Sequence, residues 1–448
     1  MQYKMEIYYK NGTIISDSGD NNLLQYDERI KAYRAPAYKY PFIIKKFKDI
    51  KDDVFNEKKL DISSNIELRP YQKKSLELWS KNDYSGTVVL PTAAGKTILG
   101  IYAITMLKVP TIVIAPTIEL IIQWRDKLRN LLNVDIGQIG GGEKEIRDIT
   151  VSTYDSAYLM ADRLGNRFKF IIADEIHHMS SESYIQIAKM YASPYRLGLT
   201  ATYERTDKMQ EILENYMGGK VFELGYEELN DYISNYKIVR IPVELSEEDE
   251  REYEKNHKIF ISYLRGRNIK LNGNMDFEKF IMTSWNPEGK EALMAWRKAR
   301  SIAFNADKKI EYLKYLLSKH AGEKTIVFSE DTSTAYLISK EFLVPAMTYM
   351  TPGRERKKYL EMFKNGEITV LATSRILDEG VDVPDASVAI IMSGSGSTRQ
   401  FRQRLGRILR PSEGKSSYLY ELVSAGTAEY GTSKRRRKGV PVGINDNP

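Results

Sequence analysis

Two long stretches of the chain alternate short apolar runs with segments whose apolar residues recur every three or four positions. Such runs predict buried strands, and the amphipathic segments predict helices that pack against a sheet. The first stretch covers residues 68 to about 225 and the second begins near residue 325. Strands are expected at 87–90, 111–115, 148–152, 168–173, 196–200, 325–328, 368–372, 387–392 and 418–423, and helices at 96–107, 118–132, 332–343, 354–364 and 397–408. The alternation predicts an α/β protein with two parallel-sheet domains in tandem.

Three further segments differ from this pattern. Residues 1–60 contain short alternating stretches and predict a small β-containing domain, so that the two α/β domains would span 61–230 and 231–448. Residues from about 246 to 300 are polar and helix-prone, which predicts a helical insertion. Its larger apolar residues should pack together: Phe260, Ile261, Tyr263, Leu264, Trp285 and Trp296. Residues 426–448 are basic and poor in apolar residues, which predicts a mobile tail with some nonspecific DNA affinity.

Aromatic and basic residues alternate within the first 60 residues. They are Tyr33, Arg34, Tyr38, Lys39, Tyr40, Lys45 and Lys46. Interleaved residues of these types can stack on bases and hold phosphates. They are equally compatible with the ordinary surface of a tyrosine-rich domain, and both interpretations stay open.

The composition excludes several classes of protein. The 448 residues are 42% apolar and 28% charged, as in an ordinary globular protein, and they include no cysteine, which excludes disulfides, thiolate catalysis and iron–sulfur clusters. The net charge of +7 favours a polyanionic partner. The chain has neither an apolar run of 18 residues nor a secretory signal, so a cytoplasmic protein without a membrane span is expected.

Two short motifs carry the candidate chemistry. Residues 91–97 read Pro-Thr-Ala-Ala-Gly-Lys-Thr between an expected strand and an expected helix, where such a segment holds phosphates on its backbone N–H groups. Asp174 and Glu175 follow another expected strand, at the edge of a parallel sheet where ligands bind. Lys96 should contact the β- and γ-phosphates and Thr97 and Asp174 should hold Mg²⁺, while Glu175 activates water. The motifs together predict hydrolysis of Mg·ATP.

The rest of the phosphate loop should contact nucleotide through Thr92, Ala93, Ala94 and Gly95. Ala93 stands where helicase loops have glycine, so a loop of slightly restricted mobility is expected. In the second α/β domain, Gln403, Arg407 and Arg410 would share one helix face at i, i+4 and i+7. They can act on a γ-phosphate as arginine fingers, or belong to a basic helix that binds nucleic acid.

These residues and others in order resemble the motifs of superfamily 2 helicases. The remaining motifs are Leu68-Arg69-Pro70-Tyr71-Gln72, Ala115-Pro116-Thr117, Ser152-Thr153-Tyr154, Leu199-Thr200-Ala201-Thr202, Thr325 to Ser329, Ala372-Thr373-Ser374 and Glu379-Gly380-Val381-Asp382. The resemblance covers about residues 68–425 and implies two RecA-like domains that close on ATP. It implies nucleotide contacts by Arg69, Gln72, Asp378 and Gly380. It also implies DNA contacts by Thr117, Thr153 and Thr373, although each threonine could instead be a helix cap or strand end.

Within that superfamily the chain is most similar to the archaeal XPB helicases, in the manner of an XPB-II-like paralogue. The similarity includes Asp174-Glu175-Ile176-His177-His178 and residues 151–157. It implies a 3′–5′ DNA helicase or translocase with ATP and Mg²⁺ as cofactors, a role in nucleotide-excision repair or promoter opening, and a nuclease partner. It also implies that residues 1–60 resemble a damage-recognition domain and that the insertion resembles a thumb.

The resemblance implies a DNA partner that is single-stranded, forked or a bubble, and the family has an Arg-Glu-Asp element that assists strand separation. Here it reads Arg205-Thr206-Asp207, so Arg205 and Asp207 are expected at the DNA and intrinsic unwinding is expected to be weak. Two alternatives share the ATPase motifs. They are a double-strand DNA translocase of the restriction-motor type and an ATP-gated DNA clamp that recruits a nuclease.

Overall fold

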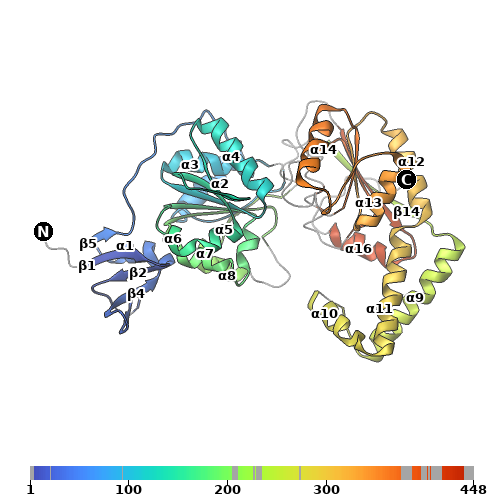
Figure 1. Cartoon of the computed structure of the whole chain (residues 1–448), viewed down its shortest axis with the longest axis horizontal. Coiled ribbons are helices and arrows are strands. Elements are labelled where there is room, and N and C mark those ends of the chain that lie inside the picture. The colour runs from blue at the N-terminus through green and yellow to red at the C-terminus, as the bar shows by residue number, and fades with distance from the viewer. Residues whose placement is uncertain are drawn as a thin grey trace. The chain divides into compact units, whose positions relative to one another are not determined.

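The computed structural model describes residues 5–20, 22–92, 94–203, 210–225, 228, 235–271, 274–374, 386–394, 401, 404 and 416–437. They belong to two compact units, Met1–Leu229 and Asn230–Pro448. Figure 1 shows a small sheet and a large sheet in the first unit, and one sheet with a long helical insertion in the second.

The small sheet has five strands in the order β3-β4-β2-β1-β5. Its elements are β1 (Met5–Lys10), β2 (Thr13–Ser16), β3 (Gln25–Asp27), β4 (Ala32–Pro36), η1 (Ala37–Lys39), α1 (Tyr40–Lys46) and β5 (Ile50–Asp53). All neighbours are antiparallel except β1 and β5. Along β1 the side chains alternate between buried and exposed, as expected for a sheet with one solvated face.

The small sheet packs against the neighbouring α/β domain through hydrogen bonds and apolar contacts. The Tyr9 hydroxyl lies 3.0 to 3.1 Å from the carbonyl oxygens of Ala161, Asp162 and Met190. Burial raises the pKa of Tyr9 to about 12, which keeps the hydroxyl a neutral donor. Ala192 of the α/β domain also belongs to the apolar core under the small sheet.

The large sheet has eight strands in the order β13-β6-β12-β11-β7-β10-β8-β9. Its strands are β6 (Ser85–Val89), β7 (Thr111–Ala115), β8 (Gly137–Gly140), β9 (Glu143–Glu145), β10 (Ile149–Thr153), β11 (Phe170–Asp174), β12 (Tyr195–Thr200) and β13 (Lys220–Glu223). Its helices are α2 (Pro70–Lys81), α3 (Lys96–Leu107), α4 (Ile118–Leu132), α5 (Tyr154–Leu159), α6 (Ala161–Leu164), η2 (Ile176–Ser180), α7 (Ile185–Met190) and α8 (Gln210–Met217). All strand pairs are parallel except β8 with β9.

Helices cover both faces of this sheet, with α2, α3 and α4 on one face and α5 to α8 on the other (Figure 1). Every residue of β7, β10 and β11 is consequently buried. Strands buried on both faces are commonly near-continuous apolar runs, as in β7 and β11, whereas β10 reads Ile-Thr-Val-Ser-Thr and is rich in β-branched residues.

The second unit has a six-stranded parallel sheet in the order β14-β19-β18-β15-β17-β16. The strands are β14 (Asn235–Val243), β15 (Thr325–Phe328), β16 (Ala346–Met347), β17 (Val370–Thr373), β18 (Val388–Ile391) and β19 (Ser416–Ser424). The helices beside it are α12 (Asp307–Lys319), α13 (Thr332–Phe342), α14 (Gly353–Asn365) and α16 (Ala428–Arg436). The predicted fold class is therefore confirmed. Apart from Phe401 and Arg404, the helix expected at 397–408 lies outside the described residues.

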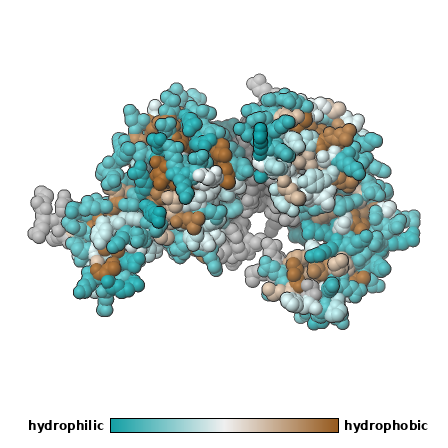
Figure 2. Space-filling view, in the orientation of Figure 1, coloured by the Kyte–Doolittle hydropathy of each residue, from teal (hydrophilic) through white to brown (hydrophobic). Residues whose placement is uncertain are grey.

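The insertion consists of α9 (Glu247–Gly266), α10 (Asn274–Met282), η4 (Thr283–Trp285) and α11 (Pro287–Phe304). Its apolar cluster contains Phe260, Leu264, Phe280 and Ala292, and Trp296 packs against it. The expectation that Trp285 packs there is wrong, because this residue is 92% exposed. Figure 2 shows apolar residues gathered on the surface of the insertion.

The expectation of a mobile tail from residue 426 is wrong for the segment that forms α16. Arg436 is buried and its Nε donates to Glu421 Oε1 of β19 at 2.6 Å. The fully buried Lys309 of α12 donates to Glu429 of α16 at 2.7 Å. Two residues of the basic run, Arg436 and Arg437, are thus anchored by the buried carboxylate of Glu421, while Lys434 and Arg435 are exposed. No helix among the described residues is long and apolar enough to span a membrane.

Candidate nucleotide-hydrolysis site

The phosphate loop runs from the end of β6 to the start of α3. Gly95 has φ of +79° immediately before α3 begins at Lys96. A Cβ on Gly95 would lie 2.6 Å from Gln72 Nε2, so both the backbone conformation and the packing require glycine. The loop therefore turns into the helix with its N–H groups at a helix N-terminus, where anions bind.

The loop is braced by the first turn of α2. The Tyr71 hydroxyl donates to the Ala94 carbonyl at 3.0 Å, and Gln72 Nε2 lies 3.3 Å from that oxygen and 3.2 Å from the Gly95 carbonyl. Gln72 Oε1 accepts the backbone N–H of Arg69 at 2.9 Å. The structure thus gives Gln72 a positioning role at the loop, and its contact with a nucleotide base stays a prediction.

Lys96 and Thr97 open α3, and both are partly buried. Lys96 Nζ lies 3.1 Å from the Leu90 carbonyl and 3.4 Å from the Pro91 carbonyl, so the ammonium is held against the loop. This places a positive charge beside the N–H groups that would receive phosphate. Thr97 is one residue further into the helix, the position at which P-loop hydroxyls bind a magnesium ion.

Asp174 ends β11 and is buried at the same edge of the sheet. Its Oδ2 accepts Trp124 Nε1 at 2.8 Å and its Oδ1 accepts the Glu175 N–H at 3.1 Å. Burial, together with the charge of Glu175, raises the pKa of Asp174 to about 6, against the opposing effects of Trp124 and Lys96. A buried carboxylate of this kind is suited to a divalent cation, whose charge would favour ionisation.

Glu175 is held in an unusual backbone conformation, with φ of +48°. Its Oε2 lies 3.3 Å from Thr200 Oγ1 at the end of β12 and 3.5 Å from His177 Nδ1. The Thr200 hydroxyl in turn lies 3.2 Å from His177 Nδ1 and 2.9 Å from the Thr202 carbonyl. A non-glycine residue in this conformation persists only where its surroundings fix it, which is a common feature of functional sites.

The cluster assembles because β6, β12 and β11 are neighbours in the sheet and all end at one edge. That edge is where open parallel sheets bind ligands. The residues present fit Mg·ATP: Gly95 provides the turn, Lys96 the ammonium, and Thr97 and Asp174 the oxygen ligands that Mg²⁺ prefers. Glu175 is held beside them with its carboxylate oriented.

Several predicted site residues lie outside the described part of the chain: Ala93, Arg205, Asp207, Asp378, Gly380, Gln403, Arg407 and Arg410. Their roles stay predictions. Arg404 is described, is 2% exposed, and has its guanidinium 5.0 Å from the Phe328 ring centre.

The three threonines predicted to contact DNA have internal hydrogen bonds. Thr117 and Thr153 cap α4 and α5, accepting the N–H groups of Leu120 and Ser156 at 3.3 Å. Thr373 is fully buried and donates to the Ser374 carbonyl at 2.7 Å. The structure favours the capping and strand-end roles for these hydroxyls.

Several aromatic and basic residues of the first 60 residues are likewise hydrogen-bonded or ion-paired within their own domain. Tyr40 is buried and donates to Asp52 at 2.6 Å, Arg34 pairs with Asp27, and Lys46 pairs with Asp20. This arrangement favours an ordinary domain surface over a row of stacking platforms.

Four residues that position the site were not assigned roles from sequence. Trp124 and Tyr154 hold Asp174, the first through its carboxylate and the second through its carbonyl at 2.9 Å. Thr200 and His177 hold Glu175. Thr200 and His177 lie within recognised motifs, so their motif membership was an available signal. Tyr154 likewise lies within the Ser152-Thr153-Tyr154 motif, whereas no motif contains Trp124.

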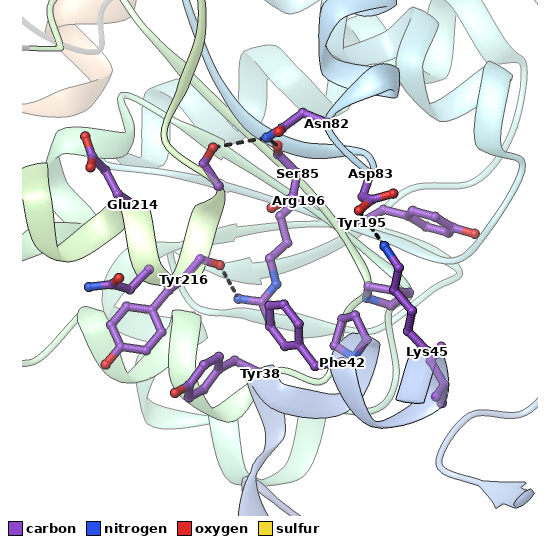
Figure 3. A pocket seen from close by; sticks show the side chains of 15 residues that line it. Tyr38, Phe42, Lys45, Asn82, Asp83, Ser85, Tyr195, Arg196, Glu214 and Tyr216 are labelled. Carbon is purple, nitrogen blue, oxygen red and sulfur yellow. Dashed lines mark hydrogen bonds and ion pairs between the residues drawn. The ribbon is translucent and has the colours of Figure 1, made fainter. Parts of the chain in front are cut away.

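A cavity of about 510 Å³ lies at the opposite edge of the large sheet (Figure 3). It is lined by Ser85 and Tyr195, which begin β6 and β12, and by Tyr38 and Phe42 of the small domain. Arg196 crosses its wall and donates to four backbone carbonyls, at 2.5 to 3.0 Å. Because this cavity lies at the amino ends of the strands, it is separate from the nucleotide cluster at their carboxyl ends.

Comparisons with known proteins agree with the order of these domains. Residues 7–54 match the family described as Xeroderma pigmentosum group B helicase damage recognition domain. Residues 65–205 match Type III restriction enzyme, res subunit, and residues 290–440 match ERCC3/RAD25/XPB C-terminal helicase.

Individual relatives extend the match to nearly the whole chain. A DNA 3'-5' translocase XPB2 of Sulfurisphaera tokodaii is 43% identical over 437 residues, covering 96% of this chain and 99% of that protein. A putative DNA 3'-5' helicase Rad25 of Haloarcula marismortui is 29% identical, covering 85% of this chain and 56% of that protein. The Hef helicase domain of Pyrococcus furiosus shares the fold, with a TM-score of 0.55, 18% identity, and coverage of 83% of this chain and 98% of that one.

The matches to helicase families and to the translocase of Sulfurisphaera tokodaii define an ATP-hydrolysing helicase of superfamily 2, and the cluster around Lys96, Asp174 and Glu175 is consistent with that class. The chain belongs to the XPB family of these helicases.

Proposed function

We propose that this chain is an ATP-driven 3′–5′ DNA translocase that opens forked or bubble DNA in nucleotide-excision repair, together with a nuclease partner. The observation that supports it most directly is the placement of Lys96, Asp174 and Glu175 at the ends of neighbouring strands, with Glu175 fixed by Thr200. The net charge of +7 suits a polyanionic partner.

Each described residue of the cluster would have a separate role in hydrolysis. Backbone N–H groups of the loop and Lys96 would bind the β- and γ-phosphates, and Gly95 lets the chain approach them closely. Mg²⁺, held by Thr97 and Asp174, would neutralise charge on the phosphates. Glu175 would orient the attacking water and accept its proton, because its carboxylate is kept in place by Thr200 and His177.

Thr200 offers a route from hydrolysis to movement. Its hydroxyl lies beside Glu175 and also accepts the Thr202 N–H at 3.2 Å. A change in charge or position at Glu175 would therefore alter the hydrogen bonds between Thr200 and the segment that follows β12. Gln403, Arg407 and Arg410 would complete the site from the second unit as groups that act on the γ-phosphate.

A forked duplex with one labelled strand tests the proposal. ATP-dependent release of the strand is expected from the wild type and not from Glu175→Gln, which keeps the side-chain size but removes the base. Displacement of a triplex-forming strand without fork opening would instead indicate the double-strand translocase. DNA binding gated by ATP without phosphate release would indicate the clamp and contradict the proposal.

A further inference from the structure

A second cavity, of about 310 Å³, lies in the second unit where the insertion meets α16. Its walls come from one face each of α9, α11 and α16, and from Gly394 just after β18. On α16 the lining residues Ala428, Thr432 and Arg435 are spaced i, i+4 and i+7, so one continuous helix face is turned toward it. The volume is at the lower end of the range for small-molecule sites.

Aromatic rings form much of the wall. Tyr253 and His257 are stacked with ring centres 5.3 Å apart and planes 11° apart. On the facing helix, the Arg300 guanidinium lies 5.3 Å from the Trp296 ring centre and 4.8 Å from that of Phe304. The cavity thus offers flat π surfaces and a flat cation, both of which stack well on planar heterocycles.

Positive charge gathers behind Gly394. A Cβ on that glycine would lie 2.7 Å from Arg436 Nη1 and 3.0 Å from Arg404 Nη1, so two guanidinium groups reach this point. Arg436 is 2% exposed, and among the described residues neither Nη1 nor Nη2 of Arg436 has a hydrogen-bond acceptor. Buried donors without acceptors are uncommon and favour a bound anion.

Glu421 pairs with Arg436 through Nε at 2.6 Å and offsets part of this charge, whereas Glu429 in the wall is bound by other groups. Glu429 Oε2 already accepts Lys309 Nζ at 2.7 Å and the Ser424 N–H at 2.9 Å. Its Oε1 is buried and receives no hydrogen bond from the part of the chain that the structure describes. An amino group of a ligand that reached this oxygen would satisfy it.

We propose that this cavity binds a single nucleobase together with its phosphate. The rings and Arg300 would stack on the base, the arginines near Gly394 would attract the phosphate, and Glu429 Oε1 would favour a base with an exocyclic amine. The proposal rests on the proposed DNA-translocase function, because the base would come from a strand held by the enzyme. A free mononucleotide has the same chemistry and is the alternative source.

Photocrosslinking of the full chain tests the proposal. The probe is single-stranded DNA with one 5-iododeoxycytidine among abasic sites, and the crosslinked peptides are mapped by mass spectrometry. Crosslinks to Tyr253, His257 or Trp296 are expected. Parallel reactions with 5-iododeoxycytidine monophosphate, in saturating ATP analogue, show whether a free nucleotide enters equally well.

Two matched pairs of variants give the controls. Thr432→Met fills the cavity and should lower crosslinking at least about fivefold, the low end of the effect of losing one stacked base, whereas Thr432→Ser should not change it. Arg435→Ala should lower crosslinking, and Lys434→Ala, which removes an equal charge from the adjacent position outside the wall, should lower it less.

DNA-stimulated ATP hydrolysis is measured on the same samples. Stimulation without crosslinks in the cavity, or crosslinks that survive Thr432→Met, would overturn this inference and leave the proposed function standing. Absence of any stimulation would count against the proposed function itself.

Discussion

Replacing Asp174 by asparagine should stabilise the protein in the absence of metal, although it removes a proposed magnesium ligand. The folded state raises the pKa of Asp174 from 3.8 to about 6, mainly because the carboxyl is buried. The folded protein therefore holds this proton more tightly than the unfolded chain does. The stability that the protonated carboxyl contributes is present at low pH and is lost as the pH rises through about 6.

The size of the effect follows from the shift. About two pKa units correspond to about 3 kcal/mol at pH 8, and to about half of that at pH 5. Asparagine avoids this cost, but its single oxygen cannot accept from both Trp124 and Glu175, which costs about 1 kcal/mol. A net gain of about 2 kcal/mol at pH 8 is expected, or about 4 to 8 °C in the melting temperature of a unit of this size.

The assay is thermal unfolding in EDTA, followed by intrinsic fluorescence, since Trp79 and Trp124 are buried in the first unit. Asp61→Asn, the same change at an exposed position, serves as the control and should alter stability by less than about 0.5 kcal/mol. The reasoning is refuted if Asp174→Asn fails to raise the melting temperature at pH 8, or if its gain is as large at pH 5.

Three other substitutions test particular contacts. Gly95→Ala should cost about 1 to 2 kcal/mol of stability, because alanine is strained in the left-handed backbone conformation of this residue. It should also weaken ATP binding in a filter-binding assay, because the new Cβ displaces Gln72, and unchanged affinity would contradict this. Arg196→Met should cost about 3 to 5 kcal/mol in denaturant unfolding, since buried carbonyls lose their donor, and a cost below 1 kcal/mol would show that they find other partners. Lys309→Met should destabilise by about 3 to 5 kcal/mol by leaving Glu429 charged and buried, and adding Glu429→Gln should recover most of the loss; a double variant no more stable than Lys309→Met would contradict the pairing.

Sequence reasoning succeeded where a pattern has one structural solution. The apolar runs of β7 and β11 and the β-branched residues of β10 favour buried strands, and helices α3 and α4 span the residues expected for them. The phosphate loop and the Asp174–Glu175 pair were placed correctly at one sheet edge because parallel strands end there.

The sequence alone does not predict which residues far apart in the chain pair with one another in the fold. The basic residues around Arg436 resemble a solvated tail, yet Arg436 and Arg437 pair with the buried carboxylate of Glu421 on β19. Trp124 reaches Asp174 across 50 positions of sequence, so neither residue signals the other. The prediction for Trp285 was wrong in the opposite direction. An aromatic residue in an apolar segment is usually packed, and this one is exposed.

The central claim is that Glu175, fixed beside Thr200, supports ATP hydrolysis coupled to DNA. Phosphate release by the wild type and by Glu175→Gln, with and without saturating single-stranded DNA, tests it most directly. DNA should stimulate the wild type, and Glu175→Gln should abolish turnover while ATP binding is retained. Turnover that ignores DNA, or that persists in Glu175→Gln, would contradict the claim.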